Sequence, residues 1–256
     1  MPTPILLIPP AINVIVTGAF AGVVLRQYLT RHRIYQLYWS IALSMAFLAT
    51  VSYIVMLFVQ PTSETGTLLF RIYYVLGGTL MPAWLGMGSI ALGCGPRMTR
   101  ICFSVLLLLS LVGTAFVLDA TINTAKLAHV AGYPGTGILK DGPWLALTII
   151  LNTLGVIAIV GVAIYSGITL IQRQASIGGI RTSNVLWANV FILAGALLNA
   201  TAGGLAATGI QSVFWLVMAV GWIVLFAGVL LASRRSRSTH PATPAAENTT
   251  HPVEAK

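Results

Sequence analysis

The stretch LLFRIYYVLGGTLMPAWLGMGSIALG, residues 68–93, decides the fold of this chain. An α-helix rises about 1.5 Å per residue, so a helix over this stretch spans the roughly 30 Å hydrocarbon core of a bilayer. Arg71 is its only charged residue and lies near its start, where a spanning helix meets the membrane interface. The stretch therefore predicts a transmembrane helix.

Two faces of this helix differ in size and polarity. At about 100° per residue, small and polar side chains gather on one face, and neighbouring helices pack closely against such faces in membranes. This predicts that the helix is the packing centre of a bundle, with the second, sixth or seventh span against Gly78 and Gly86. The bulky residues on the opposite face are expected to meet lipid or a large partner. The small face consists of Arg71, Tyr74, Gly78, Pro82, Leu85, Gly86, Ser89 and Gly93, and the bulky face of Tyr73, Leu80, Trp84, Met87 and Ala91.

The composition indicates that the whole chain belongs to the class of polytopic membrane proteins. Of its 256 residues, 57% are hydrophobic and 7% are charged, and the mean hydropathy is +0.90. Soluble domains carry about 25% charged residues. The net charge of +9 comes mainly from arginines in short runs between apolar stretches. Such runs are typical of membrane topology and not of a surface that binds nucleic acid.

Seven apolar stretches follow one another along the chain. We predict an all-α bundle of seven transmembrane helices over residues 1–233, then a disordered, basic and then polar cytoplasmic tail over residues 234–256. The long connection at 119–142 is expected to hold a short helix, residues 121–130, on the membrane surface. Pro82 frees the carbonyl of Gly78 and is expected to kink the third span. The predicted spans are residues 5–25, 36–59, 68–93, 101–118, 143–171, 184–207 and 211–232.

The positions of lysine and arginine predict the orientation, because cytoplasmic connections carry the excess of these residues. With the N-terminus outside, ten basic residues lie in cytoplasmic segments and three in outer segments. We therefore expect an outside N-terminus, a cytoplasmic C-terminus and a multi-pass protein of the cell membrane. The cytoplasmic set is Arg26, Arg31, Arg33, Arg97, Arg100, Arg173, Arg181, Arg234, Arg235 and Arg237, and the outer set is Arg71, Lys126 and Lys140.

Several chemistries lack the residues that they need. Every histidine lies outside the predicted spans, which argues against haem, zinc and di-iron sites in the membrane. No Asp or Glu lies inside a span, which disfavours an ion-coupled pump or antiporter. The topology is similar to that of microbial rhodopsins, but the last span has no lysine to bind retinal. The segment around Ser89 is similar to the serine motif of rhomboid proteases, but no histidine in the bundle could activate this serine. We therefore predict no catalytic residue, metal or cofactor.

Polar side chains in the outer half of the bundle form the candidate site. Polar groups in hydrocarbon are expected to point inward, so these residues either form hydrogen bonds between helices or line a small outward-facing pocket. Such a pocket would take an amphipathic ligand or a lipid, with Arg71 as its anionic anchor. Alternatively, Arg71 pairs with Asp119 or Glu64. The candidate pocket residues are Arg71, Tyr74, Tyr53, Asn152, Asn199, Gln211 and Trp215.

These observations favour a non-enzymatic membrane protein, either a sensory or ligand-binding bundle or an accessory subunit of a membrane complex. The alternative is a small transporter or uniporter for an uncharged or lipid-like solute. The three-plus-one-plus-three arrangement is similar to that of SWEET-type sugar uniporters, although Pro82 is the only proline deep inside a span. The expected partners are membrane lipid, a small amphipathic ligand or a partner membrane subunit, and no nucleic acid.

Overall fold

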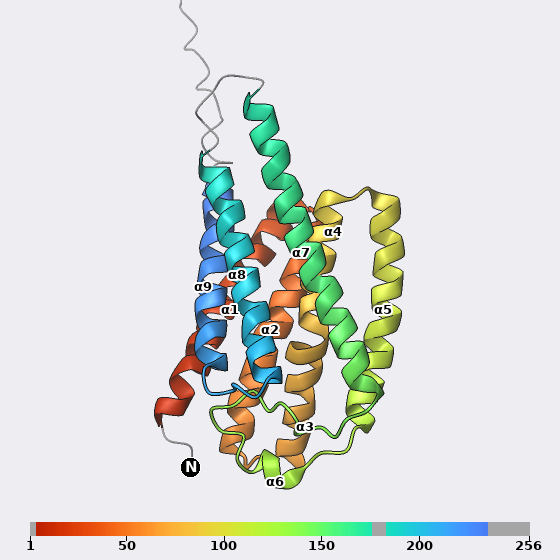
Figure 1. The fold of residues 1–256 in the computed structure, drawn as a ribbon, viewed down its shortest axis with the longest axis vertical. Coiled ribbons are helices and arrows are strands. Elements are labelled where there is room, and N and C mark those ends of the chain that lie inside the picture. The colour runs from red at the N-terminus through yellow and green to blue at the C-terminus, as the bar shows by residue number, and fades with distance from the viewer. Residues whose placement is uncertain (1–3, 176–182, 235–256) are drawn as a thin grey trace, which may run out of the picture.

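The structure is a computed structural model that describes residues 4–175 and 183–234. Within these ranges every secondary-structure element is a helix, apart from one isolated β-bridge. Seven helical segments are long and apolar enough to cross a membrane (Figure 1). This confirms the predicted all-α class and the number of apolar helices. The predicted tail lies outside the described residues, except for Arg234. The seven segments are α1 (Pro4–Arg31), α2 (Ile34–Phe58), the composite α3 (Glu64–Tyr73), η1 (Tyr74–Leu80) and α4 (Met81–Gly93), then α5 (Pro96–Asp119), α7 (Pro143–Ala175), α8 (Ser183–Ala207) and α9 (Phe214–Arg234).

The two ends of the bundle differ in composition. The α1–α2 and α4–α5 connections meet at one end, which we call the arginine-rich end because Arg31, Arg33, Arg97 and Arg100 lie there. The α2–α3 connection, residues 120–142 and the α8–α9 turn meet at the other, which we call the loop end (Figure 1). Helices α1, α2, α4, α7, α8 and α9 contact one another in that order, and α9 closes the ring on α1. Helix α5 lies outside this ring against α4, η1 and α7.

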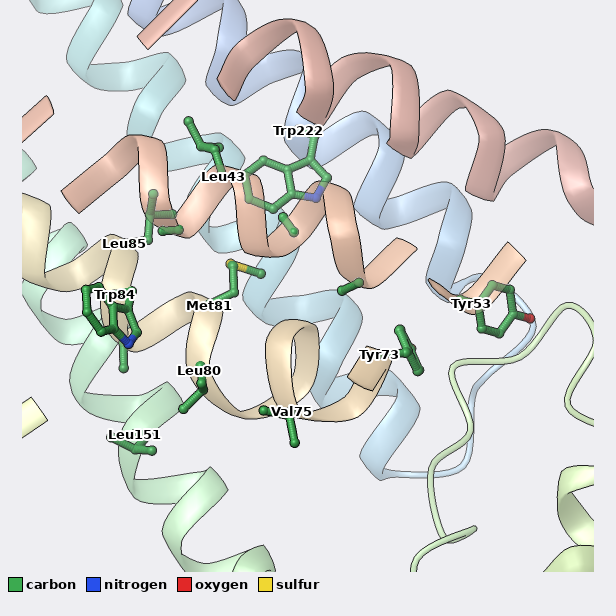
Figure 2. Close-up of a cluster of buried hydrophobic side chains, with 14 of the residues drawn as sticks. Leu43, Tyr53, Tyr73, Val75, Leu80, Met81, Trp84, Leu85, Leu151 and Trp222 are labelled. Carbon is green, nitrogen blue, oxygen red and sulfur yellow. The ribbon is translucent and has the colours of Figure 1, made fainter. Parts of the chain in front are cut away.

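The composite third span is the most deeply buried of the seven. Its bulky face, for which lipid or a large partner was expected, packs inside the bundle. Tyr73, Leu80, Trp84 and Met87 are at most 9% exposed, and Figure 2 shows three of them within a continuous cluster of buried side chains. Protein therefore surrounds this helix on both faces.

On the small face of the same span, Gly86 packs against α7, the fifth span, and not against the second, sixth or seventh span as expected. Leu85 and Ser89 of that face border a small cavity together with side chains of α2, α8 and α9. A Cβ built on Gly86 would lie 2.7 Å from both Cα and O of Gly155 in α7. A Cβ built on Gly155 would in turn collide with the carbonyl oxygen of Pro82. Gly88 makes a separate close approach to Trp39 of α2. The span therefore packs closely against α7 on one side and against α2 on the other, at glycines that allow close approach.

The chain before Pro82 is π-helical, over residues Tyr74–Leu80. Proline has no N–H to donate to the carbonyl four residues earlier, which is that of Gly78. The Met81 N–H instead bonds the carbonyl of Leu76, five residues back. The predicted disturbance at Pro82 thus takes the form of a π-helical segment, a feature that often occurs at functional sites.

Residues 120–142 do not form the surface helix that was expected at 121–130. Only α6 (Thr124–Leu127) is helical, and it is a single turn. Leu127 and Val130 are at most 2% exposed, so this segment packs into the end of the bundle. An isolated bridge between Ile122 and Leu139 closes the connection on itself.

Candidate functional site

The seven candidate pocket residues do not converge on one cavity. Tyr53, Tyr74 and Trp215 join a group of rings at the loop end, whereas Arg71, Asn152 and Asn199 each lie in a separate helix contact. Gln211 lies in the α8–α9 turn and is half-buried. We call the group of rings the aromatic cluster. It consists of Tyr53, Phe70, Tyr73, Tyr74, Trp144, Phe214 and Trp215.

The centre of the aromatic cluster joins three helices. The ring centroid of Tyr53 in α2 lies 4.6 Å from that of Trp215 in α9 and 5.3 Å from that of Tyr73 in α3. At its margin, Tyr74 meets Trp144 at the start of α7, 5.3 Å away. Aromatic pairs in this range each add about 0.5–1.5 kcal/mol beyond their burial. The cluster therefore ties the helices together beneath residues 120–142.

Two tyrosines of the cluster hold the backbone of residues 120–142. The Tyr53 hydroxyl donates to the carbonyl of Val130 and accepts from the N–H of Gly132, both at 3.0 Å. The Tyr73 hydroxyl donates to the carbonyl of Pro134 at 2.9 Å. Figure 2 shows the Tyr53 hydroxyl directed toward this segment. Tyr73 belongs to the bulky face and was therefore not among the predicted pocket residues.

The connection fits closely over the cluster. Gly132 and Gly135 have φ angles of +86° and +80°, a region that residues with a side chain rarely adopt. A Cβ built on Gly135 would lie 2.7 Å from the Phe70 ring. Ile138 and Leu139 are at most 3% exposed. Residues 120–142 are thus a fitted cover over the loop end.

Arg71 binds the end of a helix. Its Nη1 donates to the carbonyls of Val117, at 2.8 Å, and of Leu118 in the last turn of α5. These carbonyls have no N–H partner within the helix, and the partial negative charge at a helix C-terminus favours a cation. The structure pairs Arg71 with these carbonyls in place of Asp119 or Glu64.

Asn152 donates a hydrogen bond to the carbonyl that Pro82 leaves unpaired in the helix. Its Nδ2 donates at 2.8 Å to the carbonyl of Gly78, the group that Pro82 leaves without a partner. In hydrocarbon an unpaired carbonyl is costly, so this bond stabilises the π-helical segment against α7. A second bond, of 3.0 Å between the Thr79 and Thr148 hydroxyls, joins the same two elements.

Asn199 belongs to the contact between α8 and α9. A Cβ built on Gly221 would collide with its side chain, and one on Gly195 would lie 2.6 Å from the backbone nitrogen of Leu225. The two helices therefore pack backbone to backbone through small residues.

Three buried polar residues did not enter the predicted site. Asn13 is 1% exposed, and its Nδ2 donates to the carbonyls of Pro9 in α1, at 2.9 Å, and of Trp215 in α9, at 3.1 Å. Thr17 lies one turn later and bonds the Asn13 carbonyl at 2.6 Å. Gln36 is 2% exposed. The sequence could have identified Asn13, because it is a polar residue inside the apolar stretch of the first span.

Two hollows lie away from the aromatic cluster. A cavity of about 30 Å³ in the middle of the ring is lined by side chains from six helices, including Phe20, Trp39, Ser89 and Ile192. A wider recess of about 700 Å³ opens at the arginine-rich end. Within the described ranges, no three His, Cys, Asp or Glu side chains gather closely enough to hold a metal ion.

Comparison with known proteins gives no relative: no protein-family model, curated protein or solved structure matches this chain.

Proposed function

We propose that this protein is a non-enzymatic membrane sensor whose input element is the cover formed by residues 120–142. The observation that carries the proposal is the attachment of that cover by Tyr53 and Tyr73, beside the point where the third span becomes π-helical. A small amphipathic ligand or a partner membrane subunit that binds the cover would compete for these hydrogen bonds.

The bonds are suited to reversible release. The two tyrosine hydroxyls are bonded to uncharged main-chain groups, and the Trp215 side chain also interacts with the Tyr53 hydroxyl, so a ligand that offers its own donors and acceptors can replace these bonds without leaving a charge buried. Residue 73 is followed at once by the π-helical segment, and such segments frequently occur at functional sites. Through Asn152 and Thr148 that segment contacts α7, which reaches the arginine-rich end. A change at the cover thus has a continuous path through packed helices.

Native cysteines offer a readout at the far end. Cys94 follows α4 directly and is exposed, whereas Cys102 in α5 is half-buried. In a Cys102→Ser background, the rate at which a maleimide labels Cys94 reports the arginine-rich end of α4. Hydrogen exchange over residues 120–142 reports the cover.

The test is to release the cover with Tyr53→Phe and Tyr73→Phe. Each change removes only a hydroxyl and keeps the ring in the aromatic cluster. We expect faster hydrogen exchange in residues 120–142 and a change of at least about twofold in the Cys94 labelling rate, corresponding to an opening free energy altered by roughly 0.4 kcal/mol or more. Tyr133→Phe is the matched control, because that side chain lies in the same cover and is 45% exposed. A released cover with unchanged Cys94 labelling would show that the two ends are not coupled, and the sensor proposal would be wrong.

The uniporter alternative makes a different prediction for the same variants. The cavity in the middle of the ring is bordered by six helices, as a transport path would be, and the cover closes the loop end of the bundle. If the protein carries solute, releasing the cover should raise the permeability of proteoliposomes to glycerol or urea, measured by stopped-flow light scattering. A sensor leaves that permeability at the level of protein-free liposomes. Native mass spectrometry from mild detergent separates a sensor from an accessory subunit, which would retain a second polypeptide.

A further inference from the structure

We propose that the recess at the arginine-rich end binds the phosphate group of one anionic phospholipid. The recess of about 700 Å³ lies between the α1–α2 connection and the end of α4. Its lining consists of Arg31, Arg33, Ile34, Tyr35, Ala91 and Leu92. This site is at the opposite end of the bundle from the cover and does not depend on the proposed sensory role.

The two arginines have no counter-ion in the described part of the protein. Neither guanidinium forms a hydrogen bond or an ion pair with any residue among 4–175 and 183–234, whereas Arg71 at the loop end is bonded to carbonyls. The only carboxylates in those ranges are Glu64, Asp119 and Asp141, and all three belong to the loop end. Both arginines are exposed and no carboxylate of the described chain lies at their end of the bundle, so the recess is open to an anion from outside the described chain.

The turn between α1 and α2 places both arginines beside the same recess. Helix α1 ends at Arg31, and His32 has a φ of +50°, which reverses the chain so that α2 begins at Ile34. Arg31 and Arg33 thus flank a single turn residue. No side chain caps the start of α2, so its first N–H groups add positive potential at the same place. Guanidinium groups bind phosphate oxygens in pairs of parallel hydrogen bonds.

The rest of the lining favours a lipid over a free anion. Ile34 and Leu92 border the recess and are 48% and 49% exposed, so they offer an apolar surface for the start of an acyl chain. Tyr35 packs edge-to-face on Trp39 with ring centroids 5.3 Å apart, and tyrosine and tryptophan are the residues enriched at the level of lipid headgroups. Basic pockets between transmembrane helices commonly hold anionic headgroups.

The experiment compares two pairs of arginines at the same end. The full-length protein is purified in mild detergent with equal amounts of phosphatidylglycerol and phosphatidylcholine, and native mass spectrometry counts the lipids retained. The site variant is Arg31→Gln with Arg33→Gln. The control is Arg97→Gln with Arg100→Gln, which removes the same charge from exposed positions that do not line the recess. A thermal melt of each variant verifies the fold.

Wild-type protein and the control should retain one phosphatidylglycerol in preference to phosphatidylcholine. A basic residue near an anionic lipid contributes roughly fivefold in affinity, so the site variant should lose about 25-fold. If the site variant and the control variant lose phosphatidylglycerol equally, the positive charge of this end attracts the lipid without a defined site, and the proposal is wrong. The proposal is also wrong if the wild-type protein shows no preference for phosphatidylglycerol. Inorganic phosphate and glycerol phosphate serve as competitors. Displacement of the lipid by either at millimolar concentration would assign the recess to a free anion.

Discussion

The contact between Gly86 and Gly155 allows a sharp test of how the bundle is packed. Gly86→Ala adds one methyl group, which would lie 2.7 Å from Cα and O of Gly155. Carbon atoms pack best at about 3.5–4.0 Å, so α4 and α7 have to part by about 1 Å. The obstacle is backbone on both sides, and no side chain can rotate away to relieve it.

The change in the free energy of unfolding can be worked out from the contacts that are lost when α4 and α7 move apart. Overpacking of this kind costs about 1–3 kcal/mol in the free energy of unfolding. The bond between Asn152 and the Gly78 carbonyl bridges the same two helices and would lengthen, at a cost of about 0.6 kcal/mol. Alanine regains up to about 1 kcal/mol through its higher helix propensity. We expect a net loss of about 1.5 kcal/mol, which lowers the Tm by about 3–6 °C for a chain of this size.

The assay is thermal unfolding of the detergent-solubilised protein, followed by circular dichroism. Gly78→Ala is the control, because a Cβ at Gly78 would lie 3.4 Å from the Tyr74 ring of its own helix, which is an ordinary contact. We expect this variant to keep the wild-type Tm or to exceed it slightly. If Gly86→Ala has the same Tm as Gly78→Ala, then α4 and α7 do not meet backbone to backbone, and the packing described here is wrong.

Three further results are expected. A reporter fused after Lys256 should be active only in the cytoplasm and one inserted at Gly135 only outside, and the reverse pattern would overturn the orientation. Asn152→Leu leaves the Gly78 carbonyl unpaired in the bundle, so the Tm should fall by about 2–8 °C, corresponding to roughly 1–2 kcal/mol. An unchanged Tm would show that the bond contributes nothing. Deletion of the chain from Ser238 onward should leave the Tm unchanged, and a drop of several degrees would show that the tail takes part in the fold.

Much of the architecture could be read from the sequence, because a membrane limits the choice of structure. In hydrocarbon every backbone group has to be bonded internally, which allows only helices and closed β-barrels. An apolar stretch of about 20 residues has the length of a spanning helix, whereas a spanning strand needs only about 9–11 residues. The seven helices follow from that rule. Proline chemistry likewise predicted that the Gly78 carbonyl would lose its partner, although not that Asn152 would supply one.

The tertiary structure alone decided which faces meet. Lipid tails are as apolar as leucine, so the sequence of a membrane helix hardly distinguishes a face against lipid from a face against protein. The small face of the third span therefore left its neighbour open, and the structure places α7 there. Residues 120–142 illustrate the same limit: their hydrogen bonds to Tyr53 and Tyr73 join segments far apart in the chain. No local pattern encodes such contacts, because they depend on the positions of helices that only the assembled bundle sets.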